Sequence, residues 1–207
     1  MKVLKFGGSS VGTSQNILNV RRIVEGTDRP VIVVVSALGG VTDTLIRLGR
    51  MAAAADYGYR AVLDEMVERH HRMVAEVIAA DRQAALTARL DALFDELRSI
   101  LQGLSLLQDL TPKTADAIVA YGERLSSLIA AALIPEARHY DSRAFIRTRR
   151  QGNGHIVDFD ETRRLVRETF AERCPVSVVG GFIASDVETG QTTNLGRGGS
   201  DYTAAII

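Results

Sequence analysis

The chain has 207 residues, of which 46% are apolar and 24% charged, and its 25 basic and 25 acidic residues leave no formal net charge. This composition is typical of a folded globular domain, and it argues against a disordered chain and against a dedicated binder of nucleic acid or anionic membranes. The one cysteine, Cys174, excludes an internal disulfide framework and a multi-cysteine zinc site. Since no apolar run is long enough for a signal peptide or a membrane span, we expect a soluble cytoplasmic protein.

The first 35 residues predict a strand, a helix and a second strand. Residues 2–6 (KVLKF) form the first strand, and a helical pattern follows over residues 14–25. Residues 31–35 (VIVVV) are β-branched throughout, which is typical of a strand buried on both faces of a parallel sheet. The predicted helix has an apolar face that consists of Ile17, Val20, Ile23 and Val24.

A long helical region comes next. Apolar residues at three- and four-residue spacing predict helices over residues 43–57, 60–80 and 82–102. We expect these helices to form an inserted layer, at about 43–110, and not crossovers of the sheet. A fourth helix is predicted from Pro112 to about residue 133, with Thr111 as its N-cap.

The last third of the chain predicts further strands and helices. Strands are expected at 138–141, 145–148, 155–157 and 176–179, with a turn at Gly152, Asn153 and Gly154 and a helix over 160–173. The final segment reads as a polar strand, a glycine-rich loop and the start of a helix. Because that helix is cut short, we expect the chain to be truncated at its C-terminus.

Two glycine-containing loops follow the first two predicted strands. In residues 5–10 (KFGGSS), Lys5 precedes two glycines and two hydroxyls, a pattern that can hold an anion, with a structural turn and an exposed lysine as the alternative. Residues 36–43 (SALGGVTD) follow the second strand at its carboxyl end, where parallel sheets bind ligands. Ser36 and Thr42 offer hydroxyls there, although Thr42 is equally suited to capping the next helix.

Two later motifs also suggest a ligand. Gly122 lies inside a predicted helix, where glycine costs about 1 kcal/mol relative to alanine, so something must approach it closely. Next to it, Glu123 and Arg124 taken alone indicate a solvated pair. In residues 195–201 (LGRGGSD) glycines surround an arginine, which can bind a carboxylate bidentately. A flexible turn that ends in a helix cap, at Ser200 or Asp201, is the alternative.

The remaining polar features are expected to carry no chemistry. We expect a solvated helix face for two adjacent histidines, surface positions for three arginines and a small core position for the cysteine; these residues are His70, His71, Arg147, Arg149, Arg150 and Cys174.

Together the four motifs resemble those of the aspartokinases, which are members of the amino-acid kinase family. Residues 5–11 (KFGGSSV) are similar to K-F-G-G-T-S-V, and residues 36–42 to S-x-x-x-G-x-T. Residues 122–127 match G-E-R-L-S-S, and residues 195–201 match L-G-R-G-G-S-D. The resemblance runs through the whole chain in the family's order.

Two positions depart from the family pattern. Ser9 replaces the commoner threonine, and Asn194 stands where threonine is common. The variable segments look most like the kinase half of the bifunctional aspartokinase–homoserine dehydrogenases.

The resemblance implies a three-layer α/β/α fold with a mostly parallel central sheet. It also implies transfer of the ATP γ-phosphoryl group to the β-carboxylate of L-aspartate, giving 4-phospho-L-aspartate for lysine, threonine and methionine biosynthesis. ATP with Mg²⁺ would act in the complete enzyme, which is expected to be a homo-oligomer without nucleic-acid or membrane partners. Since a carboxylate is already ionised at pH 7, this reaction requires positioning and charge stabilisation and no general base.

The resemblance further implies roles for individual residues. Lys5 would stabilise the transferring phosphoryl group, and Asp201 would orient Lys5. Within the aspartate site, Arg197 would hold the α-carboxylate and Glu123 the α-amino group. The full set expected to bind aspartate is Ser36, Thr42, Glu123, Arg197, Gly198, Gly199 and Ser200. The set expected near the nucleotide is Lys5, Gly7, Gly8, Ser9 and Gly40, and no metal ligand is expected.

We therefore expect residues 1–207 to be the N-terminal, aspartate-binding lobe of an amino-acid kinase domain. In the family, the nucleotide lobe and regulatory ACT domains come later, so we expect the chain alone to lack kinase turnover. Other amino-acid kinases, acting on glutamate, acetylglutamate, carbamate or a nucleotide, remain alternatives, as does a non-catalytic amino-acid-binding module. A nicotinamide-binding Rossmann domain is disfavoured, because GGSSVG is not G-x-G-x-x-G.

Overall fold

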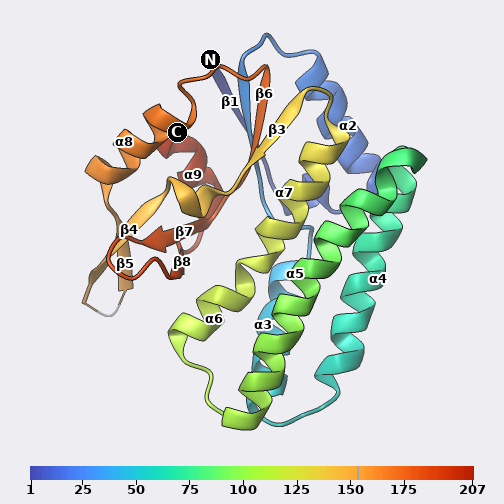
Figure 1. Cartoon of the computed structure of the whole chain (residues 1–207), viewed down its shortest axis with the longest axis vertical. Helices are drawn as coiled ribbons and strands as arrows, with labels where there is room; N and C mark the ends of the chain where they lie inside the picture. Colours follow the sequence, from blue (N-terminus) through green and yellow to red (C-terminus); the bar gives the residue numbers. More distant parts are fainter. Residues whose placement is uncertain (153) are drawn as a thin grey trace.

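The computed structural model describes residues 1–152 and 154–207, and its main sheet has four parallel strands in the order β1-β2-β6-β3 (Figure 1). The strands are β1 (Lys2–Phe6), β2 (Val31–Val35), β6 (Val176–Gly180) and β3 (Ala137–Tyr140). All five residues of β2 are buried, as are all five of β6. The buried parallel strands expected from the apolar runs are therefore confirmed.

Helices cover both faces of this sheet, so the three-layer α/β/α arrangement is also confirmed. Along β2, Val31, Val33 and Val35 belong to a core shared with α2 (Ser14–Glu25) and α7 (Tyr121–Leu133). The alternate residues, Ile32 and Val34, belong to a second core with side chains of α8 (Phe159–Thr169) and α9 (Gly199–Ile206). Figure 1 shows these two helix pairs on opposite sides of the sheet.

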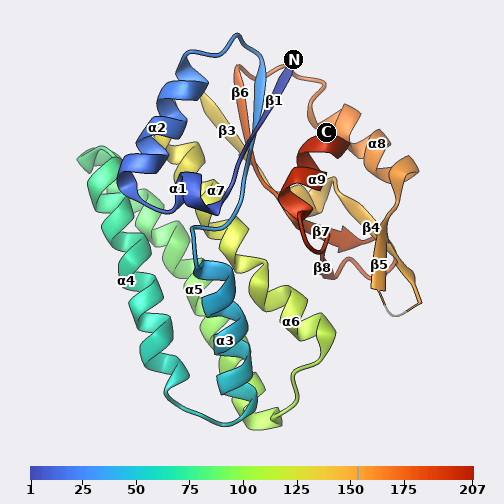
Figure 2. The same cartoon turned by 180° about the vertical axis from the view of Figure 1, so that it is seen from behind.

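The helical region extends beyond the carboxyl end of the sheet as a bundle (Figures 1 and 2). It contains α3 (Val41–Ala53), α4 (Tyr59–Val77) and α5 (Ala80–Leu107), close to the predicted bounds. The predicted fourth helix is instead two helices, α6 (Pro112–Val119) and α7, with a break at Ala120.

One prediction in this bundle was wrong. His70 does not lie on a solvated face: it is fully buried, donates from Nδ1 to the Met66 carbonyl at 2.7 Å, and meets the Phe94 ring edge-on. Its neighbour His71 is partly exposed and pairs with Asp91 at 2.7 Å. Adjacent helix positions face different directions. Both histidines contact α5, but His70 is enclosed there, whereas His71 lies beside Asp91 and stays partly open to solvent.

A second, mixed sheet lies beside the first, with the order β5-β4-β7-β8. Its strands are β4 (Arg147–Gln151), β5 (Gly154–Val157), β7 (Ile183–Asp186) and β8 (Thr192–Asn194). Sequence patterns did not predict β7, which is short and entirely buried. The turn expected at 152–154 includes residue 153, which lies outside the described residues.

Several smaller expectations need correction. Ile23 was placed on the buried face of α2, but 53% of its surface is exposed. Arg147 was placed on the surface, but it is half-buried and donates to the Ser185 hydroxyl at 2.7 Å. Cys174 was expected in the core, but it is only partly buried. It lies beyond the end of α8, where its thiol is 3.3 Å from the Tyr140 hydroxyl.

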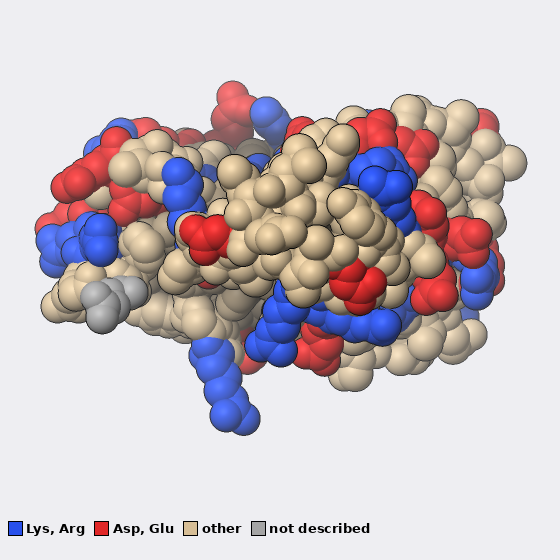
Figure 3. All heavy atoms as spheres, turned by 90° about the horizontal axis from the view of Figure 1, so that it is seen from below, with Lys and Arg blue, Asp and Glu red and all other residues tan. Residues whose placement is uncertain are grey.

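The surface shows the balance of charge expected from the composition. Seen from below, basic and acidic side chains are interspersed around a broad uncharged area (Figure 3). No helix among the described residues is both long enough and apolar enough to cross a membrane.

Candidate functional site

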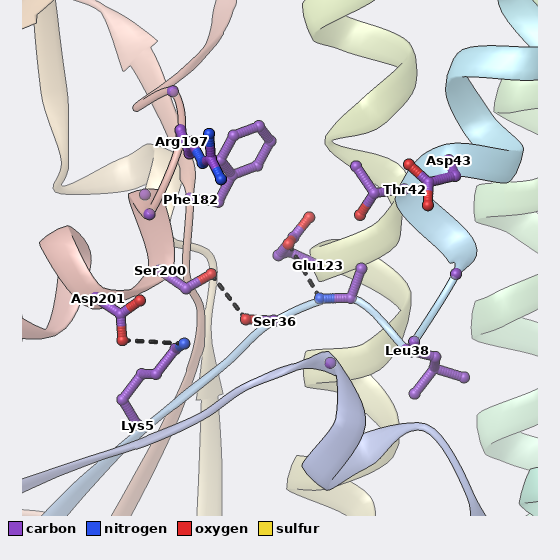
Figure 4. A pocket seen from close by; sticks show the side chains of 17 residues that line it. Lys5, Ser36, Leu38, Thr42, Asp43, Glu123, Phe182, Arg197, Ser200 and Asp201 are labelled. Atoms are coloured by element: carbon purple, nitrogen blue, oxygen red, sulfur yellow. Dashed lines mark hydrogen bonds and ion pairs between the residues drawn. The ribbon is translucent and has the colours of Figure 1, made fainter.

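A cavity of about 360 Å³ lies where β1 and β2 end, between the start of α3, α7 and the loop that leads into α9 (Figure 4). It brings together eleven of the thirteen residues expected to form the site. These are Lys5, Gly8, Ser36, Gly40, Thr42, Glu123, Arg197, Gly198, Gly199, Ser200 and Asp201. The other two do not line it: Gly7 is the N-cap of the four-residue helix α1 (Gly8–Val11), and Ser9 lies within that helix.

Glu123 is the buried carboxylate of this pocket. It is only 3% exposed, and its Oε1 accepts a hydrogen bond from the Ala37 N–H at 3.0 Å. Its Oε2 has no hydrogen-bond partner in the part of the chain that the structure describes. Burial raises the pKa of Glu123 to about 7, although the Ala37 hydrogen bond opposes that rise. The solvated pair that the sequence alone suggested is therefore wrong.

Its neighbour Arg124 points to a different partner. The Arg124 guanidinium donates to Glu96 at 2.9 Å and lies over the Tyr121 ring, 4.4 Å from the ring centroid. The two adjacent charges of the G-E-R motif thus serve different structures: one faces the pocket, and the other ties α7 to α5.

Gly122 explains how α7 comes so close to the loop after β2. A Cβ at position 122 would lie 2.6 Å from the Cβ of Ala37, so any side chain would push the helix away. The close approach is held by Ser126, whose hydroxyl donates to the Ser36 carbonyl at 2.8 Å. The expectation of a close neighbour at Gly122 is confirmed.

Two polar contacts join the strand ends to α9. Lys5 Nζ lies 3.0 Å from Asp201 Oδ1, and the Ser36 hydroxyl donates to the Ser200 hydroxyl at 3.0 Å (Figure 4). The Lys5 side chain is 24% exposed, whereas that of Asp201 is 71% exposed. The lysine is thus held at the pocket by a carboxylate that remains open to water.

Arg197 lies in the exposed loop between β8 and α9. Gly196 and Gly198 on either side have φ angles of +73° and +74°, which favour glycine. The Arg197 side chain makes no hydrogen bond or ion pair with any described residue, so its five N–H donors are available to a ligand. The N-cap of α9 is Gly198, so neither Ser200 nor Asp201 caps that helix.

A similar correction applies to Thr42. The N-cap of α3 is Gly40, with φ of +83°, and Thr42 lies in the first turn with its side chain toward the pocket (Figure 4). Thr42 is therefore not the cap of the helix.

Four side chains that line the pocket were not among the expected site residues: the small or apolar Ala37 and Leu38, and also Asp43 and Phe182. Asp43 follows Thr42 in the first turn of α3 and was inside the motif, but no role was assigned to it. Phe182 has a φ of +66°, an uncommon backbone conformation for a bulky residue. It is held there because its N–H donates to Thr203 Oγ1 and its carbonyl accepts the Leu195 N–H. Nothing in a one-dimensional pattern signals such a conformation.

The sequence model of the amino acid kinase family matches the whole chain, residues 1–207. The chain belongs to the amino acid kinase family. Within this family it is 32% identical to aspartokinase 1, chloroplastic, of Arabidopsis thaliana, over 99% of this chain and 37% of that protein. It is 33% identical to a bifunctional aspartokinase/homoserine dehydrogenase of Zea mays, over 99% of this chain and 23% of that protein.

Solved structures of the same family share the fold. Aspartokinase III of E. coli, in complex with aspartate and ADP, superposes with a TM-score of 0.86 at 27% identity, over all of this chain and 46% of that one. This amino acid kinase chain therefore spans less than half the length of the relatives that it matches. It is an aspartokinase-like domain that corresponds to part of those longer proteins.

Proposed function

We propose that this chain forms the L-aspartate site of an aspartate kinase, in which the γ-phosphoryl group of ATP is transferred to the β-carboxylate. The observation that carries the proposal is that one cavity of about 360 Å³ is lined both by a buried carboxylate, Glu123, and by Arg197, whose guanidinium has no partner among the described residues. An α-amino acid presents an ammonium group and a carboxylate, which these two side chains match. The solved relative that binds aspartate and ADP supports the same substrate.

In this proposal, Arg197 holds the α-carboxylate bidentately, and the Ser200 hydroxyl and the N–H groups at the start of α9 add donors. The α-ammonium faces Glu123, whose buried Oε2 gains a partner. The raised pKa of Glu123 fits this role, since a cation beside the carboxylate restores its ionised form. Hydroxyls of Ser36 and Thr42 complete the lining.

Lys5 then marks the place of phosphoryl transfer. A β-carboxylate oxygen attacks the γ-phosphorus, the bond from that phosphorus to the ADP oxygen breaks, and ADP leaves. The Lys5 ammonium, held by Asp201, compensates the negative charge of the transferring group. The acceptor carboxylate is ionised at neutral pH, so none of the pocket residues has to remove a proton.

ATP supplies the phosphoryl group in this scheme, and Lys5 with the glycine turns at Gly8 and Gly40 would lie near its phosphates. Mg²⁺ would arrive with the nucleotide, because it is commonly bound by one or two carboxylates together with substrate phosphates. The described residues contain no cluster of three His, Cys, Asp or Glu side chains that could hold a metal by themselves.

The proposal is tested by calorimetric titration of the chain with L-aspartate, beside Arg197→Ala and with circular dichroism to verify folding. We expect saturable binding that Arg197→Ala weakens by about a hundredfold or more, since a bidentate charge-assisted pair is lost. N-acetyl-L-glutamate, which has no ammonium group for Glu123, should not compete. Absence of L-aspartate binding by the folded chain, or equal binding of the acetylated amino acid, would contradict the assignment.

A further inference from the structure

The two side chains proposed to hold opposite groups of the amino acid come from segments far apart in sequence. Glu123 lies in the first turn of α7, whereas Arg197 lies between β8 and α9. An amino acid that contacts both side chains requires a fixed distance between them. Whatever sets that distance must connect these two segments.

An indirect connection runs through Ser36, which accepts a hydrogen bond from Ser126 and donates one to Ser200. One side chain joins the two segments directly. Asn194, the last residue of β8, donates from Nδ2 to the Asp116 backbone carbonyl at 3.2 Å and to Asp116 Oδ1 at 3.1 Å. Within the described ranges, no other hydrogen bond joins residues 112–133 to residues 183–207. α6 also packs directly against β8, so the contact is part of a continuous interface.

Both ends of this contact lie close to the pocket residues along the chain. The Asp116 carbonyl also accepts the Ala120 N–H at 3.2 Å, and the Ala120 carbonyl accepts the Arg124 N–H at 3.2 Å. These bonds carry the position of Asp116 across the break between α6 and α7 to Glu123. On the other side, Asn194 precedes Arg197 by three residues, with only Leu195 and Gly196 between.

Because the Asn194–Asp116 contact is partly buried, we expect it to stabilise the fold more than a hydrogen bond at the surface does. Asp116 is half-buried, and burial raises the pKa of its carboxyl group while the Asn194 hydrogen bond opposes that rise. Asn194 Oδ1 is buried without a partner among the described residues, so its two donated bonds alone fix the amide. Both residues line a second cavity, of about 830 Å³, which shares the lining residue Gly196 with the pocket.

We propose that Asn194 is a positioning residue: its amide, bonded to Asp116, helps to fix the distance between Glu123 and Arg197 and thereby how well one ligand contacts both side chains at once. The consequence for ligand binding rests on the proposed function, whereas the connection itself is a property of the chain without ligand. The two statements can therefore be tested separately.

The connection is tested by amide hydrogen exchange on the unliganded chain and on Asn194→Ala. Loss of two hydrogen bonds should speed exchange about threefold to tenfold, both at residues 195–199 and at residues 119–124. Gln191→Ala, in the turn before β8, serves as the matched control, since that side chain makes no hydrogen bond to a described residue. Unchanged exchange at 119–124 in Asn194→Ala would overturn the proposal. If Asn194→Ala does not fold, Asn194→Leu removes the donors with nearly the same shape and no added charge, and should give the same result.

The consequence for binding is tested by titrating the same variants with L-aspartate and with succinate, which keeps both carboxylates but lacks the ammonium group. Asn194→Ala should weaken L-aspartate about tenfold and succinate not at all, because only a ligand that contacts both Glu123 and Arg197 depends on their separation. Equal weakening of both ligands would overturn the positioning role. If the unchanged chain binds no L-aspartate, the proposed function fails, and the exchange measurement still decides whether the connection exists.

Discussion

The pocket wall buries a glutamate and the helical bundle buries a histidine, and burial shifts the pKa values of these two side chains in opposite directions. Glu123 is 3% exposed in the pocket wall, and His70 is fully buried between α4 and α5. Burial disfavours the charged form of both, so it raises the pKa of Glu123 to about 7 and lowers that of His70 to about 4. At pH 6 both side chains are mostly neutral.

The surroundings of Glu123 and His70 differ in whether a ligand can reach the side chain. Glu123 lines the cavity, and a cation that enters can restore its charge. His70 does not line that cavity; it packs against the Phe94 ring, and its Nε2 is buried with no partner within the described residues. Burial therefore leaves Glu123 able to interact with a cation that enters the cavity, whereas the buried His70 only packs against its neighbours.

Glu123→Gln should remove a dependence of stability on pH. The folded pKa of about 7 is above the ordinary value of 4.5, so the folded chain holds the proton more tightly. The stabilising contribution is complete below pH 4.5 and is lost as pH rises through about 7, by about 3 kcal/mol in all. Urea unfolding at pH 5 and pH 8 measures this loss. Glu65→Gln, at an exposed position of α4, should keep the wild-type difference, and an unchanged slope in Glu123→Gln would show that the carboxyl is solvated.

His70→Leu should remove a dependence of opposite sign and similar size. The folded pKa of about 4 is below the ordinary value of 6.5, so the unfolded chain binds the proton more tightly. Stability is lost as pH falls from 6.5 to 4, by about 3 kcal/mol, and the leucine variant should not show that loss. Thermal unfolding across this range measures it. The matched control is His71→Leu, which should keep the loss of stability at low pH. If that loss disappears in His71→Leu, it comes from His71 and not from His70.

Gly122→Ala tests how closely the pocket carboxylate is held. Its new Cβ would lie 2.6 Å from that of Ala37, so α7 must shift, and we expect a loss of about 2 kcal/mol. Gly103→Ala, inside α5 with nothing within 4 Å of the new Cβ, should instead gain up to about 1 kcal/mol from helix propensity. Denaturant unfolding of the pair measures both. Two variants of equal stability would mean that the contact at Gly122 is loose.

Asp201→Asn should have the smallest effect on stability. Its ion pair with Lys5 spans 3.0 Å, but the Asp201 side chain is 71% exposed, so solvent screens the pair. We expect a change below about 0.5 kcal/mol in the free energy of unfolding, smaller still in 0.5 M salt. A loss of several times that size would show that Lys5 is a structural residue of the sheet edge.

The main sheet and the helices could be predicted because their signals are local. The run VIVVV indicated a strand buried on both faces, and the spacing of apolar residues gave α3 to α5 within a few residues. The small sheet was harder. β7 has only four residues, two of them polar, and it is buried because Arg147 and the neighbouring strands surround it.

The residues of the site could be predicted from the sequence, but their burial and backbone conformations could not. Motifs at strand ends converge because parallel strands end at one edge of the sheet, so most of the expected residues line one cavity. The burial of Glu123 depends on Gly122 meeting Ala37, and the conformation of Phe182 depends on Thr203 and Leu195. Contacts between positions so far apart in the chain leave no trace in local spacing.

β1 is one of the two edge strands of the main sheet, and it also carries Lys5. Its inner edge pairs with β2, and its outer edge pairs with no strand among the described residues. A strand added there would run about 4.8 Å from β1. A strand that extends the sheet on this side would thus also lie beside Lys5 of the pocket.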